Sequence, residues 1–231
     1  MLLTTISIAG ADDPSPLGKQ NKVATAKKIA MFDGNSLKGW RGRKDLWSVA
    51  DGAIVGKTSK EKPIKGNTFL IWQNGTPGDF EMLADFLISS GNSGIQYRSK
   101  VINEDKFVVG GYQADIDFAL KFAGINYEEK GRGILALRGE KATIGADGKK
   151  NKEKFGDTDK MGSVIKPGQW NRYRIVAKGN TLTHYINDVM TSQVVDNQPS
   201  KAAGSGVIAL QLHQGPAMEI RFKNLFLTPL K

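Results

Sequence analysis

The chain has 231 residues, a length that fits one all-β domain, and 39% of them are hydrophobic, which is enough for a sizeable core. It contains no cysteine, and this excludes disulfides, thiolate metal ligands and a cysteine nucleophile. The formal net charge is +10, but the lysines are scattered and no arginine-rich helix, zinc motif or aromatic RNA-binding signature accompanies them, so we expect no nucleic-acid partner.

Residues 1–28 are interpreted as a truncated export signal, a flexible linker, or both. The first eleven residues, MLLTTISIAGA, are apolar and end in a small-x-small pattern, although they lack a positive start. They are too short to span a membrane, and no other segment is a candidate. We therefore expect export to the periplasm or the cell exterior and a single domain over residues 29–231. The sequence leaves the oligomeric state open.

Short apolar runs separated by turn signals predict about a dozen strands. In residues 79–88 the apolar side chains alternate with Glu81 and Asp85, which is the period of two expected for a strand. The predicted strands, in chain order, are residues 46–49, 53–55, 69–72, 79–88, 94–99, 111–116, 133–138, 171–177, 181–186, 189–195, 206–212 and 218–227.

The connecting segments contain no long amphipathic helix. Residues 140–162 form the longest polar stretch and are predicted to be a loop, because Gly, Lys and Asp recur throughout. Residues 126–129 are also assigned to a loop. This pattern of strands predicts an all-β fold, a two-sheet antiparallel sandwich.

Three of the predicted strands pair an apolar face with a face of hydrogen-bonding residues. Lysine is absent from these polar faces although it is frequent elsewhere, so a cleft for a sugar-like ligand is favoured over an ordinary solvent-facing surface. His184 falls on a strand that is predicted to be exposed and is interpreted as a surface histidine. The residues of the polar faces are Gln96, Arg98, Gln113, Asp115, Asp117, Gln211 and His213, with Arg138, Glu81 and Asp85 as additions from two further strands.

Several motifs in a fixed order carry a resemblance to a known family. They are FDGNSLKGW at 32–40, GNSGIQYR at 91–98, GYQADI at 111–116, GQWN at 168–171, YIND at 185–188, LQLH at 210–213 and IRFKNL at 220–225. Together they resemble the 3-keto-disaccharide hydrolase domain family. The resemblance implies a concanavalin A-like jelly-roll sandwich related to laminarinase-type hydrolases, export in many members, and a keto-sugar or other carbohydrate ligand.

The resemblance also implies cleavage of 3-keto-glycosides by elimination and hydration, which is net glycoside hydrolysis. His213 is the candidate base, because imidazole ordinarily titrates near neutral pH. Arg98 is expected to stabilise the oxyanion, and Asp115 to orient His213 or protonate the leaving oxygen. The residues expected to bind substrate are Gln96, Gln113, Gln211, Arg138, Glu81, Tyr127 and Glu128, the last two in a loop that would close over the cleft.

No cofactor is required by the sequence. A divalent metal remains an option, with Asp115, His213 and Glu81 as donors, but their spacing does not demand one and no metal residue is assigned. Ordinary glycoside hydrolysis needs two flanking carboxylates, and the best match to the acidic strand of laminarinase-type enzymes, residues 113–118, lacks both outer acids. The main alternative is a non-catalytic carbohydrate-binding module, and a structural domain of a larger exported complex is a further one.

Overall fold

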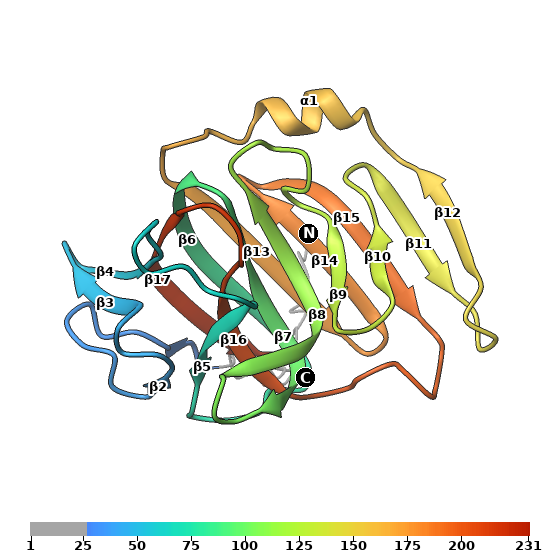
Figure 1. Ribbon diagram of the computed structural model, residues 1–231. Coiled ribbons are helices and arrows are strands. Elements are labelled where there is room, and N and C mark those ends of the chain that lie inside the picture. The colour runs from blue at the N-terminus through green and yellow to red at the C-terminus, as the bar shows by residue number, and fades with distance from the viewer. Residues whose placement is uncertain (1–26) are drawn as a thin grey trace, which may run out of the picture.

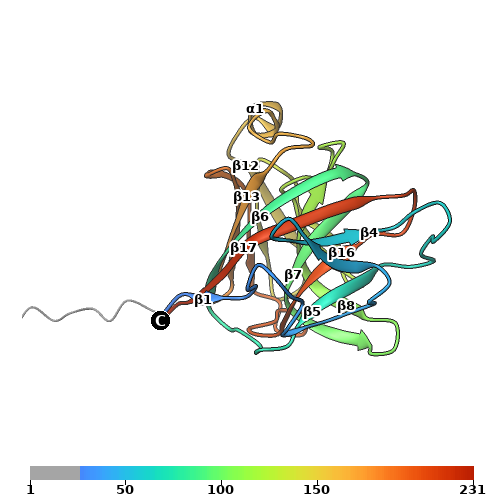
Figure 2. The same ribbon diagram turned by 90° about the vertical axis from the view of Figure 1, so that its left-hand side faces the viewer.

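The computed structural model describes residues 27–231, so nearly all of the predicted export signal and linker lies outside the described residues. Two sheets pack face to face and form a sandwich (Figure 1). Figure 2 shows the layers from the side, with β6, β13 and β17 in one sheet and β5, β7 and β8 in the other. The predicted two-sheet all-β fold is confirmed.

The larger sheet has ten strands. Its path is β12-β11-β15-β14-β13-β6-β17-β4-β3, and β1 pairs with β17. All neighbouring strands are antiparallel except β11 and β15, which run parallel. The bounds are β1 Ile29–Ala30, β3 Trp47–Ala50, β4 Ala53–Lys57, β6 Phe80–Ser90, β11 Glu140–Ile144, β12 Lys150–Lys154, β13 Asn171–Lys178, β14 Thr181–Ile186, β15 Val189–Asp196 and β17 Glu219–Pro229.

The smaller sheet has seven strands in the order β10-β9-β8-β7-β16-β5-β2, and every pair is antiparallel. The polar faces predicted from the sequence belong to β7, β8 and β16, which are neighbours here. The bounds are β2 Trp40–Arg41, β5 Thr68–Trp72, β7 Asn92–Asn103, β8 Val108–Asp117, β9 Asn126–Glu129, β10 Gly133–Ala136 and β16 Val207–Leu212.

The main core lies between the two sheets. On β6 the even-numbered residues from Phe80 to Ile88 are buried in it, as the period-two pattern predicts. Ile95 on β7, Ala114 on β8 and Leu210 on β16 supply the facing layer. A smaller apolar cluster of Phe69, Ile71, Val109 and Ala209 lies apart from this core. By strand alternation it occupies the opposite, outer face of the seven-stranded sheet, beside the polar residues.

The prediction of a loop over residues 140–162 is wrong. Strands β11 and β12 form a hairpin at the edge of the ten-stranded sheet, and helix α1, Thr158–Ser163, follows. Only Ala142 and Ile144 of β11 face the core, and β12 is a lysine-rich edge strand. Charged side chains are common on edge strands because they oppose pairing with another chain, which explains the polar sequence. Within residues 27–231 the helical segment found is six residues long and cannot cross a membrane.

The prediction of a loop at residues 126–129 is also wrong, because this segment is β9 and pairs with β8. The connection between β8 and β9 is fixed by Asp117. Its carboxylate accepts hydrogen bonds from the backbone N–H groups of Ala119 at 3.2 Å and Phe122 at 3.0 Å. The loop is thereby held over the end of the outer face, where a cleft forms.

Candidate functional site

A cleft of about 600 Å³ opens on the outer face of the seven-stranded sheet. It lies where β8 and β9 run side by side and where the chain leaves β16. Its walls combine carboxylates, amides, two lysines, one histidine and the aromatic rings of Phe122 and Tyr127. The polar lining residues are Asn67, Asn92, Gln113, Asp115, Asp117, Lys121, Tyr127, Glu129, Lys130, His213 and Gln214.

Asp115 lies at the bottom of this cleft and is 6% exposed. Burial raises the pKa of its carboxyl group to about 8. A hydrogen bond from Gln113 lowers this pKa, while the nearby negative charges of Glu129 and Asp117 raise it. At neutral pH the Asp115 carboxyl is therefore mostly protonated, so it can donate a proton or a hydrogen bond.

A chain of buried amides holds Asp115 from behind. Gln113 Nε2 donates to Asp115 Oδ1 at 2.5 Å, and Gln113 Oε1 accepts from Gln96 Nε2 at 2.7 Å and from Gln211 Nε2 at 3.1 Å. Ser99 Oγ donates to Gln96 Oε1 at 2.7 Å. The three strands thus bring the predicted glutamines together, but Gln96 and Gln211 are fully buried and only Gln113 lines the cleft. Gln96 and Gln211 do not reach the cleft themselves; they hold the side chain of Gln113 in place by hydrogen bonds.

His213 follows the last residue of β16 and is half-buried at the cleft wall. Its Nδ1 lies 2.5 Å from the Gln214 carbonyl oxygen, so this ring nitrogen carries the hydrogen and donates it. The Nε2 atom is then the basic atom of the ring. The adjacent backbone is fixed because Gln214 N–H donates to Asn67 Oδ1 at 3.0 Å. The structure therefore brings His213, Asp115 and Gln113 to one cleft.

Tyr127 lines the cleft from β9, and its neighbour in the cleft is Glu129 rather than Glu128. Burial raises the pKa of Tyr127, and the charges of Glu129 and Asp115 raise it further. Glu129 accepts from Asn67 Nδ2 at 3.3 Å and lies 3.7 Å from the Lys130 amine. The sequence analysis missed Glu129 because it placed this segment in a loop, where side chains do not alternate between faces.

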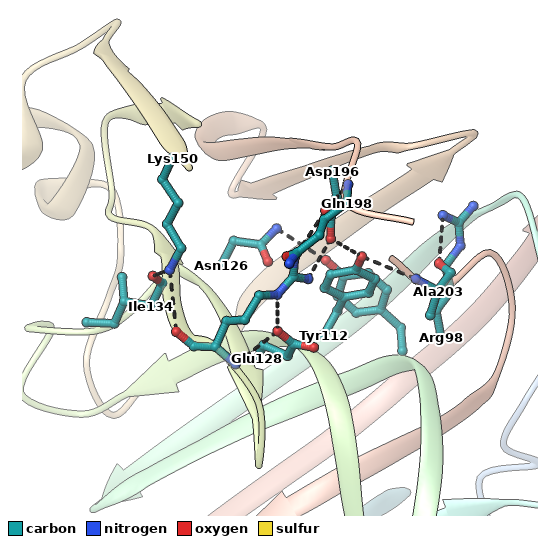
Figure 3. Close-up of polar contacts among 11 residues, drawn as sticks. Arg98, Tyr112, Asn126, Glu128, Ile134, Lys150, Asp196, Gln198 and Ala203 are labelled. Atoms are coloured by element: carbon teal, nitrogen blue, oxygen red, sulfur yellow. Dashed lines mark hydrogen bonds and ion pairs between the residues drawn. The ribbon is translucent and has the colours of Figure 1, made fainter. Parts of the chain in front are cut away.

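The prediction that Glu128 closes the cleft is wrong, since strand alternation turns its side chain away. Its carboxylate pairs instead with Arg132, which also binds Asp196 (Figure 3). Tyr112 donates to the same Asp196 carboxylate at 2.5 Å. This buried group of four residues joins the β9–β10 turn to the end of β15.

The prediction that Arg98 faces the polar cleft is wrong, because a bulge interrupts β7 between Tyr97 and Lys100. Arg98 has a φ of 44°, so its side chain does not follow the alternation between the two faces of the strand. Its guanidinium donates to the carbonyl oxygens of Gly78 at 2.9 Å and Gly179 at 2.7 Å and pairs with Asp79 at 2.7 Å. These contacts bind β7 to the turns of the ten-stranded sheet.

Two other predicted residues also lie away from the cleft. The buried guanidinium of Arg138 donates to the carbonyl oxygens of Leu120 and Ala123, each at 2.7 Å, and so supports the β8–β9 loop from behind. Glu81 lies on β6 of the other sheet, where it pairs with Arg174 at 3.4 Å. The metal donor set of Asp115, His213 and Glu81 is therefore not assembled. Across residues 27–231, no cluster of three or more His, Cys, Asp or Glu side chains could hold a metal ion.

The prediction that His184 is a surface residue is wrong, since its side chain is fully buried between the sheets. Its Nε2 lies 2.8 Å from the Tyr97 hydroxyl and its Nδ1 lies 3.2 Å from the Ile125 carbonyl oxygen. The rings of Tyr97 and Tyr173 each pack edge-on against the imidazole. Burial lowers the pKa of His184 to about 3, although the bond to Ile125 acts in the opposite direction.

Residues 27–228 match the model of the 3-keto-alpha-glucoside-1,2-lyase-like domain family. This match covers almost the whole of the described chain and agrees with the family that the sequence motifs resemble. The chain belongs to the 3-keto-alpha-glucoside-1,2-lyase-like domain family. No curated protein sequence matches it.

Solved structures share the sandwich of this 3-keto-alpha-glucoside-1,2-lyase-like domain. A proposed glycosyl hydrolase from Parabacteroides distasonis aligns with a TM-score of 0.57 and 18% identity, covering 93% of this chain and 98% of its own. The carbohydrate-binding module CBM66 from Bacillus subtilis aligns with a TM-score of 0.54 and 15% identity, covering 82% of this chain and 95% of its own. These similarities show the fold. They do not identify the reaction, which has to be argued from the residues of the cleft.

The cleft of this lyase-like domain can carry out proton transfer. It offers a mostly protonated carboxyl at Asp115 and an imidazole at His213, and Lys121 and Lys130 also line it. It does not offer a row of tryptophans for stacking on sugars, since Trp40, Trp47 and Trp72 are buried in the core. The arrangement therefore suits acid–base chemistry on a polar ligand better than flat-surface binding.

Proposed function

We propose that this domain cleaves 3-keto-glycosides by elimination followed by hydration. The observation that carries the proposal is that a buried carboxyl with a pKa of about 8, Asp115, and an imidazole, His213, line one cleft. A carboxyl group that is protonated at neutral pH and an imidazole nitrogen that can accept a proton form the acid–base pair that such chemistry needs. The family match supports the substrate class.

In the proposed reaction the carbonyl at C3 makes the hydrogen at C2 acidic. His213 Nε2 takes the C2 proton, and the electron pair moves to the C3 oxygen as an enolate. The enolate then expels the oxygen at C1, which receives the Asp115 proton and leaves as an alcohol. The cation of Lys121 is available to stabilise the enolate charge, in place of the predicted Arg98.

The hydration half-reaction uses the same two groups in the reverse direction. Asp115, now a carboxylate, removes a proton from water as the water oxygen adds to C1. His213, at the wall of the open cleft, exchanges its proton with solvent and then delivers a solvent proton to C2. The net change is hydrolysis, with both residues restored to their starting protonation states. Gln113 keeps Asp115 oriented throughout, because its amide hydrogen bond occupies Oδ1 and leaves Oδ2 free for the substrate.

Turnover of a panel of 3-keto-glycosides by the parent protein and by His213→Ala tests this proposal. The panel contains 3-keto-trehalose and 3-keto aryl glucosides, each assayed with and without a chelator. We expect sugar release by the parent and a loss of at least about a hundredfold in the variant. Chelator sensitivity would add a metal ion to the mechanism.

Binding without turnover is the alternative function. It would be supported if no member of the panel were cleaved while unoxidised sugars bound saturably. The scarcity of aromatic rings in the cleft argues against it, since Phe122 and Tyr127 are the aromatic residues among those that line it. Such modules commonly rely on exposed aromatic side chains.

A further inference from the structure

A second hollow of about 320 Å³ lies beside the cleft, at the bulged ends of β7 and β8. Its other walls are the β9–β10 turn and the segment that leads into β16. Glu129 and Lys130 line both hollows, so the two are neighbours on either side of this pair. In the following paragraphs this second hollow is called the basic pocket.

The basic pocket lies within reach of a ligand held in the cleft. Along β8, Gly111 in the basic pocket is four residues from Asp115 in the cleft, which corresponds to about 13 Å of strand. Gly111 pairs with Glu129 and Gln113 pairs with Tyr127, so β9 runs beside it over the same length. A glycoside whose reacting sugar lies at Asp115 can therefore extend its other half towards the basic pocket.

Buried contacts fix the walls of the basic pocket. On one side, Arg98 donates hydrogen bonds to the Gly78 and Gly179 carbonyl oxygens. On the other side, an arginine, Arg132, pairs with Glu128 and Asp196 (Figure 3). Gly131 has no room for a side chain, because a β-carbon there would lie 2.5 Å from the Glu128 carboxyl carbon. These contacts hold two walls of the basic pocket in place.

The charges around the basic pocket are unequal. Arg132 pairs with both Glu128 and Asp196, so these three groups together keep one negative charge, and Glu129 lies 3.7 Å from the Lys130 amine. Lys100 and Lys201 also line the rim, and neither forms an ion pair within residues 27–231. Because Arg98 is paired with Asp79 and Lys130 with Glu129, these two lysines leave the groups around the pocket with an excess of one positive charge. Such a pocket attracts a negatively charged group and is unfavourable for a positively charged one.

We infer that the basic pocket is a subsite for an anionic group, a carboxylate, sulfate or phosphate, carried by the half of the glycoside that is joined to C1. The inference rests on the proposed function for the direction of the ligand, since the reacting sugar is assigned to the cleft. It names a class of substrate, glycosides with an acidic leaving half. Lys100 and Lys201 are the residues that select it.

The test measures binding of unreactive, unoxidised aryl α-glucosides by calorimetry. The aryl group carries a carboxylate, a sulfate, a phosphate or, as the neutral control, a carboxamide. The parent is compared with Lys100→Gln/Lys201→Gln and with Lys38→Gln/Lys166→Gln. The second variant removes the same charge from exposed positions outside both hollows. Each titration is run at low and high salt.

We expect the Lys100→Gln/Lys201→Gln variant to lose about five- to tenfold in affinity for at least one anionic glucoside and less than twofold for the carboxamide. High salt should reduce the difference in affinity between this variant and the parent, because it screens the charges. The Lys38→Gln/Lys166→Gln control should bind all four ligands as the parent does. The anionic glucoside that loses the most affinity identifies the anion that the basic pocket prefers. The inference is overturned if all four ligands weaken equally, or if the control variant shows the same loss. Because these ligands are not cleaved, the result is independent of whether turnover is found.

Discussion

The two histidines of the chain occupy opposite environments, although both lie at or beside strands. His184 is fully buried between the sheets, with Tyr97, Tyr173 and the Ile125 carbonyl around its ring. His213 stands half-buried where β16 ends, at the wall of an open cleft. The same side chain is thus a neutral part of the core in one place and, in the other, lines an open cleft where we propose that it accepts a proton. The comparison shows that the environment, rather than the residue type, decides which histidine can serve in catalysis.

The carboxyl groups near these histidines differ in the same way. Asp117 accepts two backbone hydrogen bonds and holds a loop, whereas Asp115 accepts one amide bond at the bottom of the cleft and stays mostly protonated at neutral pH. A buried acid without a cationic partner reduces the stability of the fold. Such a group is expected where function requires it.

The largest expected effect comes from His213→Ala. We expect turnover of a 3-keto-glycoside to fall by about 100- to 10,000-fold, because the base for the C2 proton is removed. The free energy of unfolding should change by about 0.5 kcal/mol or less, since the side chain is half-buried and packs in no core cluster. Steady-state kinetics and urea unfolding measure the two quantities. If His213→Ala lost as much stability as a core substitution does, His213 would be a structural residue like His184, and the contrast between the two histidines would be wrong.

Asp115→Asn should lower turnover, by less than His213→Ala does, because the acid for the leaving oxygen is removed, and it should stabilise the fold. The folded chain keeps a proton on Asp115 up to about pH 8, whereas an unfolded aspartate, with a pKa of 3.8, releases it much earlier. Stability is therefore lost as the pH rises through this window, and at pH 7 the substitution should recover about 2–4 kcal/mol. Urea unfolding at pH 7 measures the gain. A variant less stable than the parent at that pH would contradict the raised pKa.

The seven-stranded sheet shows how much of the site could be predicted from the sequence. Alternation along regular strands correctly groups Gln96, Gln113 and Gln211, and it brings Asp115 and His213 to the same face. Alternation fails at Arg98, because a bulge shifts the register and a sequence pattern does not reveal where a strand is interrupted. The fold was predictable because its long strands carry strong apolar alternation.

The remaining errors come from information that the sequence pattern does not contain. Glu81 has the right parity but belongs to the other sheet, and which strands share a sheet depends on long-range pairing. Arg138 binds the carbonyls of a loop that a pattern of side chains cannot position. His184 lies on a strand whose neighbours, Thr183 and Tyr185, are polar in sequence, and its burial becomes visible only once β14 is placed at the centre of a sheet.

The buried His184 should make the free energy of unfolding depend on pH, with a smaller effect than that of Asp115. In the parent the two effects oppose each other, because a falling pH stabilises the fold through Asp115. An unfolded histidine takes up a proton as the pH falls below 6.5, while folded His184 stays neutral down to about pH 3, so stability is lost as the pH falls. In Asp115→Asn the free energy of unfolding should therefore drop by about 2 kcal/mol between pH 7 and pH 5. Urea unfolding at both values measures it. The drop should be absent when His184→Gln is added, and its persistence there would assign it to another group.

Glu129→Gln should produce the smallest change, a shift in the pH profile. The negative charge of Glu129 raises the pKa of Asp115, so its removal should lower that pKa. The loss of kcat/KM above neutral pH should then begin at a pH lower by roughly half a unit. A pH profile of kcat/KM measures it, with Glu128→Gln as the matched control from the opposite face of β9. An upward shift, or an equal shift in the control, would count against the assignment of Asp115 as the acid.

The central claim is that the glycosidic bond breaks by elimination, with His213 removing the proton at C2. Cleavage of a 3-keto-glycoside in D₂O, followed by NMR of the released sugar, tests this claim most directly, because hydration returns a proton from solvent to C2. The account predicts deuterium at C2 of the sugar released by the parent, above the level that the uncatalysed substrate acquires, and no such release by His213→Ala. Release of a sugar that keeps its original hydrogen at C2 would instead mean direct displacement at C1 and would contradict the account.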